Sequence, residues 1–122
     1  DAEDPDNVGR MLDAYPNYYI DIAARVPELG RHPAKVMRRF FIRYQDRVLF
    51  ATDIGVGRGN LMLGSGDGTV KTLDDAKKFY AQIYKYFETS LPAIKSPTPI
   101  QGDWDIYPVG LPKTVLDKIY YK

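Results

Sequence analysis

A short apolar run near the middle of the chain ends in a carboxylate. Residues Val48–Ala51 combine β-branched, aromatic and small side chains, and Thr52 and Asp53 follow them directly. An unbroken apolar run of this kind is typical of a strand buried on both faces, as in a parallel sheet covered by helices. Catalytic groups of α/β proteins lie at the carboxyl ends of such strands. We therefore expect Asp53 to be the main catalytic residue.

A second set of charged residues accompanies an earlier strand-like segment. Residues 18–23 alternate between two faces and contain Asp21, while the segment after them contains Arg25 and Glu28. Two carboxyl groups about 5 to 9 Å apart would suit glycoside hydrolysis, one acting as acid and the other as base or nucleophile. Asp21 and Glu28 are therefore catalytic candidates beside Asp53, and Arg25 is a candidate oxyanion or carboxylate clamp. Asp21 and Asp53, within one strand and at the end of the other, are expected to face one pocket. The alternative for Asp21 is an internal hydrogen bond or an ion pair with Arg25.

Two further residues are candidates for contacting a substrate. His32 is the single histidine, and Trp104 is the single tryptophan, in a proline-rich stretch. Aromatic side chains in irregular segments stack on sugars or on partner chains. Trp104, Tyr107 and the glycine-rich segment 54–72 would then form the contact surface of a binding or assembly module. Packing within the chain is the alternative for both His32 and Trp104.

The elements that must position these residues are predicted from periodicity and from helix-breaking residues. Apolar side chains at helical spacing predict four helices, with start signals at Asp4, Pro33, Thr72 and Pro112. The strands are predicted at 18–23 and 48–51. The segments between them are expected to be irregular, over 24–31, 54–72 and 88–110.

The glycine-rich segment 54–72 has Gly-x-Gly spacings that resemble phosphate loops. They match neither the dinucleotide fingerprint nor the P-loop, so we expect a mobile active-site or lid loop instead. The predicted class is α/β, with two strands that are too few to bury both sheet faces and both edges alone.

Composition restricts the function classes. The chain has 122 residues, 44% of them hydrophobic, which suits a single domain over residues 1–122. A net charge of +1 gives no indication of nucleic-acid binding, and no apolar run would span a bilayer, so no membrane partner is expected. The absence of Cys excludes disulfides and thiolate chemistry and agrees with a reducing, cytoplasmic location. One histidine is too few for a multi-histidine metal site within one chain.

Two segments together resemble the C-terminal part of the amidohydrolase-related TIM-barrel hydrolases. They are Leu12–Ile22, which contains the pattern Tyr-Pro-Asn-x-Tyr-x-Asp, and Asp46–Asp53, which contains Arg-Val-Leu-Phe-Ala-Thr-Asp. The chain from Pro112 onward is similar to the family's last helix. The resemblance implies a partial (β/α)8 barrel: two buried parallel strands with flanking helices, completed by self-association.

The resemblance also implies a role for Asp53. In the family, the last strand ends in an Asp that binds the catalytic metal or acts as general acid/base on a metal-bound water, which matches Asp53. A divalent ion such as zinc lowers the pKa of bound water to about 7, and a carboxylate then accepts or relays its proton. The family hydrolyses amides and lactones and also includes decarboxylases and hydratases, so the fold does not select a reaction.

The family's metal-binding histidines have no counterpart in this chain. A catalytic zinc takes three protein ligands plus water, so one chain alone is not expected to bind the metal. We therefore expect a homo-oligomer with a small-molecule substrate, in which Asp53 serves a hydrolase site. The alternatives are a metal-free, carboxylate-dependent hydrolase acting as an oligomer, and a non-catalytic assembly or binding module.

Overall fold

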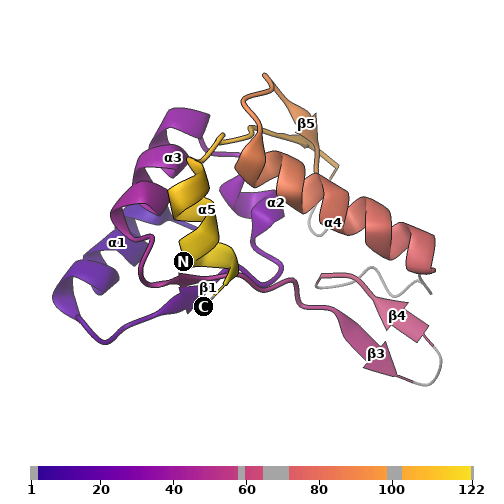
Figure 1. Ribbon diagram of the computed structural model, residues 1–122, viewed down its shortest axis with the longest axis horizontal. Helices are drawn as coiled ribbons and strands as arrows, with labels where there is room; N and C mark the ends of the chain where they lie inside the picture. The colour runs from indigo at the N-terminus through magenta and orange to yellow at the C-terminus, as the bar shows by residue number, and fades with distance from the viewer. Residues whose placement is uncertain (1–2, 58–59, 65–71, 99–102, 122) are drawn as a thin grey trace.

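The computed structural model describes residues 3–57, 60–64, 72–98 and 103–121, and the structural statements below concern these residues (Figure 1). The helices are α1 (Pro5–Ala14), α2 (Val26–Leu29), α3 (Ala34–Arg43), α4 (Leu73–Glu88) and α5 (Lys113–Tyr120). The strands are β1 (Ile20–Asp21), β2 (Val48–Leu49), β3 (Gly55–Gly57), β4 (Asn60–Met62), β5 (Ile94–Lys95) and β6 (Asp105–Ile106).

Helix starts agree with the capping residues in the sequence. The Asp4 carboxylate accepts hydrogen bonds from the amides of Asp6 and Asn7, which satisfies donors that the first turn of α1 leaves unpaired. At α4, Thr72 and Asp75 form a reciprocal capping box. The four helices predicted from periodicity are thus confirmed.

The two predicted strands pair in parallel. Ile20 lies opposite Val48 and Asp21 opposite Leu49, and the chain crosses between the strands through α2 and α3. Both strands are shorter than predicted, because only two residues of each form the ladder. Helix α5 covers the other edge of β2, where the Phe50 amide donates to the Ile119 carbonyl at 3.2 Å.

The mixed α/β class is confirmed, but the described residues contain two-stranded sheets and no barrel. Beyond the parallel pair, β3 and β4 form an antiparallel hairpin and β5 pairs antiparallel with β6. The prediction that the intervening segments are irregular was wrong in three places. Residues 24–31 contain α2, the described part of 54–72 contains β3 and β4, and residues 88–110 contain β5 and β6. The rest of the expected lid loop, over 58–59 and 65–71, lies outside the described residues.

An aromatic core joins the two halves of the chain. Phe41 of α3 and Phe87 of α4 are fully buried and meet edge to face, with ring centroids 5.3 Å apart. The backbone also connects distant segments, because the Val109 amide donates to the Tyr86 carbonyl at 2.8 Å and the Tyr107 amide to the Gly30 carbonyl at 2.8 Å. The segment after β6 is therefore fixed against both α2 and α4.

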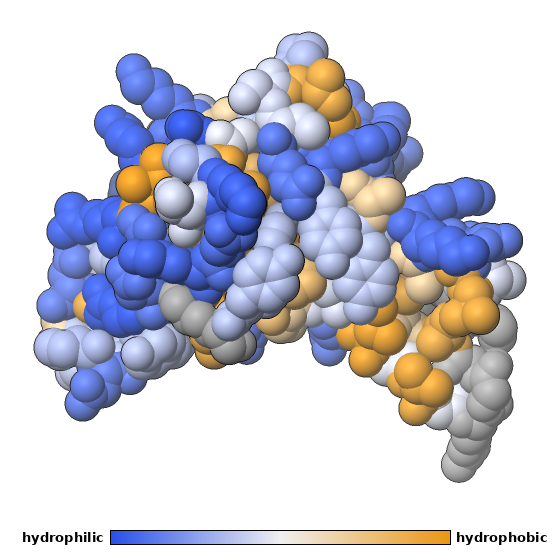
Figure 2. Space-filling model, in the orientation of Figure 1, coloured by the Kyte–Doolittle hydropathy of each residue, from blue (hydrophilic) through white to orange (hydrophobic). Residues whose placement is uncertain are grey.

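The β3–β4 hairpin carries apolar side chains into solvent. It extends away from the group formed by α1, α3 and α5 (Figure 1), and orange, apolar residues gather over it in Figure 2. Val56 is 79% exposed and Met62 54% exposed. No described helix combines the length and apolar character needed to cross a membrane.

Candidate functional site

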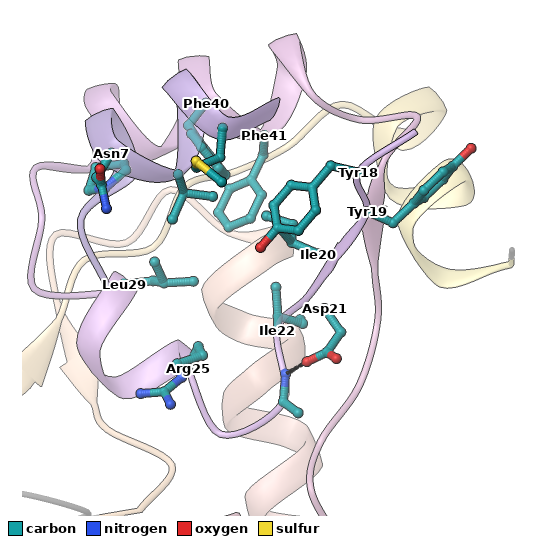
Figure 3. A pocket seen from close by; sticks show the side chains of 14 residues that line it. Asn7, Tyr18, Tyr19, Ile20, Asp21, Ile22, Arg25, Leu29, Phe40 and Phe41 are labelled. Carbon is teal, nitrogen blue, oxygen red and sulfur yellow. Dashed lines mark hydrogen bonds between the residues drawn. The ribbon is translucent and has the colours of Figure 1, made fainter. Parts of the chain in front are cut away.

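A cavity of about 500 Å³ runs along β1, between α1, α2 and α3 (Figure 3). Leu29, Phe40 and Phe41 provide much of its apolar lining. Asp21 and Arg25 are its charged lining residues. The volume lies within the range of about 300 to 1,000 Å³ that is usual for small-molecule sites.

The cavity borders the edge of β1 that faces away from β2. The amides of Ile20 and Ile22 donate to the carbonyls of Arg47 and Leu49, at 3.0 and 3.2 Å, so these residues use the β2 side of the ladder. In a parallel ladder the alternate residues point their backbone groups to the opposite side. The amide and carbonyl of Asp21 therefore lie on the edge that β2 does not occupy.

Asp21 and Arg25 line the same cavity without pairing. The Asp21 carboxylate accepts a hydrogen bond from the Ala23 amide at 2.9 Å, which fixes the turn that leaves β1. Figure 3 shows Arg25 on the other side of the cavity. Of the alternatives considered for Asp21, the local hydrogen bond is present, whereas the described residues show no ion pair with Arg25.

Asp53 lies beyond the carboxyl end of β2 and does not line this cavity. Its backbone is left-handed, with φ of 56°, and Ala24 after β1 is left-handed too, with φ of 52°. Such conformations cost non-glycine residues about 1 to 3 kcal/mol and concentrate at functional sites. Because β1 and β2 are parallel, both strained turns lie at the same end of the strand pair. The expectation that Asp21 and Asp53 face one pocket is not met in this cavity.

Glu28 lies in α2 and is 7% exposed. Neither of its carboxylate oxygens has a hydrogen-bond partner within the described structure. Burial without a partner is costly for a charged group. Glu28 does not line the β1 cavity, so it is separated from Asp21 and Arg25.

The two predicted substrate-contacting residues are both engaged within the chain. The ring of His32 forms a hydrogen bond with the Glu3 carbonyl at 2.8 Å through Nε2. The Trp104 indole donates to the Pro27 carbonyl at 2.9 Å, and the Arg31 guanidinium lies 4.5 Å from its ring centroid. Neither His32 nor Trp104 lines the β1 cavity.

The described residues contain no group of three or more His, Cys, Asp or Glu side chains that could hold a metal ion. Asp53, the expected metal ligand, therefore belongs to no such group among the described residues. The described residues of one chain therefore do not fit the metal of the resembled family.

Sequence reasoning missed a second cavity of about 750 Å³ beside the start of α3, which has a basic lining. The helical spacing of Lys35 and Arg38 opposite the apolar stripe of α3 was its one signal, and that pattern is also typical of a solvated helix face. The other walls come from residues 90–92 and 107–110, more than 50 positions further along the chain.

Comparison with known proteins found no matching family model, no matching curated protein and no matching solved structure. The resemblance to the amidohydrolase-related hydrolases therefore rests on the sequence alone, on its two strand motifs and its last helix.

Proposed function

We propose that this chain is the C-terminal part of an amidohydrolase-like barrel and supplies Asp53 to a hydrolase active site. The observation that supports this most is the parallel β1–β2 pair, crossed over through α2 and α3, with a left-handed residue after each strand. Active sites of barrel enzymes lie at that end of the strands.

Asp53 has the exposure that an acid/base group needs. Its side chain is exposed, and no described residue bonds its carboxylate. In our proposal this carboxylate accepts a proton from an attacking water and returns it to the leaving group, which is the usual task of a general acid/base. Because the metal of the resembled family does not fit one chain, no step is assigned to it.

The proposal requires other strands to complete the site, and we infer that further copies of the chain supply them. Two strands do not close a barrel, and the edge of β1 that faces away from β2 offers backbone groups to another strand. A homo-oligomer would therefore surround Asp53 with groups that a single copy lacks.

The proposal is tested by measuring molar mass in solution together with turnover of chromogenic esters and lactones. We expect an oligomer whose activity falls about 100-fold or more in Asp53→Asn, the size of effect typical of a general acid/base. Asp103→Asn, which removes an exposed carboxylate elsewhere, is the matched control. An inactive, monodisperse monomer would refute the proposal, as would turnover that Asp53→Asn leaves unchanged.

A second candidate is a metal-free, carboxylate-dependent hydrolase that uses the β1 cavity. It is favoured by the presence of Asp21 and Arg25 in one cavity of suitable size. This candidate predicts turnover of chromogenic glycosides that survives EDTA and is lost in Asp21→Asn. Loss in Asp53→Asn alone would favour the first proposal.

A further inference from the structure

We propose that the basic cavity beside the start of α3 binds a small molecule that carries two or more anionic oxygens. The cavity has a volume of about 750 Å³ and is lined by Arg31, Lys35 and Arg38. No described residue in its lining is Asp or Glu. It shares no lining residue with the β1 cavity, so this inference does not depend on the proposed hydrolase function.

No carboxylate among the described residues neutralises the three cations of this cavity. Arg43 on the same helix pairs with Asp13 at 2.9 Å, and Lys118 pairs with Asp46 at 3.0 Å. Three like charges around one hollow repel each other, and an anion between them would relieve that repulsion.

Two of the cations are held in place by the surrounding structure. Arg38 donates through Nη1 to the Val109 carbonyl at 3.0 Å, and the Val109 amide is itself bonded to the Tyr86 carbonyl. Arg31 stacks on Trp104, whose indole is anchored to the Pro27 carbonyl. Side chains that are ordered before binding lose less conformational entropy when a ligand arrives.

The opposite wall is stiff and carries neutral donors. Gly110 is left-handed, with φ of 53°, and a Cβ at this position would clash with the Ser90 hydroxyl. Pro92 and Pro108 restrict the backbone on either side. The hydroxyls of Ser90 and Tyr107 add hydrogen-bonding groups to the lining.

These features define the ligand by its chemistry. Guanidinium groups bind carboxylates and phosphates through two parallel hydrogen bonds, and a lysine adds a mobile charge. The volume is that of a small-molecule site, and the chain's net charge of only +1 argues against a nucleic-acid surface. A phosphate-bearing or polycarboxylate metabolite satisfies these requirements.

The test is calorimetric titration of the full chain with pyrophosphate and with citrate, each at constant ionic strength, and with acetate as the singly charged comparison. We expect the two multivalent probes to bind and acetate to bind about tenfold more weakly or not at all. The relative strength of pyrophosphate and citrate then separates phosphate from carboxylate recognition.

The double variant Arg31→Gln/Lys35→Gln should weaken binding about tenfold or more, since each 1.4 kcal/mol lost corresponds to a factor of ten. Arg39→Gln/Arg43→Gln is the matched control, with the same charge change on α3 outside the cavity. Equal weakening in both variants, equal binding of acetate, or no binding by the wild type would overturn the proposal. Lys35→Gln alone, at an exposed position, provides a second variant should the double variant not fold.

Discussion

The two cavities differ in the sign and pairing of their charges. The β1 cavity has one carboxylate and one guanidinium, Asp21 and Arg25, over an apolar floor. The cavity beside α3 has three cations and no described acid. A mixed pair is suited to proton transfer or to a polar, uncharged substrate, whereas a set of like charges is suited to holding an anion. The difference indicates separate tasks for the two cavities.

The cavities also differ in how the chain builds them. Residues between 5 and 41 line the β1 cavity, so one continuous stretch makes it. The basic cavity requires residues 31–38 to meet residues 90–92 and 107–110. Its shape therefore depends on long-range packing, and perturbing the later segments should affect it more than the β1 cavity.

The largest effect is expected at the floor of the β1 cavity, because that floor is also the core. Phe41 has 0% exposure and contacts Phe87 edge to face. Phe41→Ala should lower the free energy of unfolding by about 3 to 5 kcal/mol, measured by chemical denaturation. Tyr18→Ala is the control, since Tyr18 lines the same cavity but is 42% exposed. A loss in Phe41→Ala as small as that expected for an exposed position such as Tyr18 would show that the floor is not part of the core.

The basic cavity should be most sensitive at Gly110. An alanine there would adopt a left-handed backbone and clash with Ser90, so Gly110→Ala should cost about 2 kcal/mol or more. We expect pyrophosphate binding to fall with it, while the β1 cavity is unaffected. Gly57→Ala, where a Cβ meets nothing within 4 Å, is the control and should change stability by about 0.5 kcal/mol at most. An unaltered melting curve for Gly110→Ala would contradict the close approach to Ser90.

In the sequence, Glu28 lies between Arg25 of the β1 cavity and Arg31 of the basic cavity. Substitutions at Glu28 show whether its buried carboxylate has a role in either cavity. A buried oxygen without a partner costs about 1 to 3 kcal/mol, so Glu28→Met should raise the free energy of unfolding by that order. Glu28→Gln separates charge from polarity, because it keeps the shape and removes only the charge. A loss of stability in Glu28→Met would show that the Glu28 carboxylate has a hydrogen-bond or ionic partner. A loss of ester turnover with unchanged stability would instead support Glu28 as a catalytic residue.

Much of the fold could be predicted from the sequence, because its signals are local. The stripes and caps of α1, α3, α4 and α5 lie within single segments, and the apolar run ending near Asp53 located β2. The pairing of β5 with β6 has no such signal. These strands have two residues each, and their pairing depends on contacts across the intervening segment, such as the Lys95–Asp105 ion pair at 3.0 Å. Two-residue strands are too short for an alternating pattern to be recognised.

The candidate site could also be predicted only in part. Asp21 and Arg25 were both named as site candidates from the sequence, and both line the β1 cavity. The placement of Asp53 relative to them depends on the turn geometry after β2, which residue types do not fix. The basic cavity could not be predicted from the sequence, because its two walls are far apart along the chain. They are brought together by long-range contacts such as the hydrogen bond from Arg38 to the Val109 carbonyl.

Tyr86 lies between the two cavities. Its predicted effect is the smallest, a change in how the free energy of unfolding depends on alkaline pH. Its ring lies 6.5 Å from that of Phe41 in the floor of the β1 cavity, and its carbonyl holds Val109 at the wall of the basic cavity. Burial raises the pKa of Tyr86 far above the ordinary value near 10. Below pH 10 both states keep the proton. Above it only the unfolded chain loses the proton, so the stability that Tyr86 contributes falls as pH rises.

The stability of the wild type should therefore decline above about pH 10, with Tyr86 responsible for about 1.4 kcal/mol per pH unit. Tyr86→Phe should remove that share of the slope. At neutral pH it should cost little, because the Tyr86 hydroxyl is buried and has no hydrogen-bond partner in the described structure. Tyr107→Phe, at a 43% exposed position, should keep the wild-type slope. Denaturant titrations between pH 8 and about 11.5 measure both. Equal slopes for Tyr86→Phe and the wild type would mean that the hydroxyl reaches water, and that the core between the two cavities is open rather than packed.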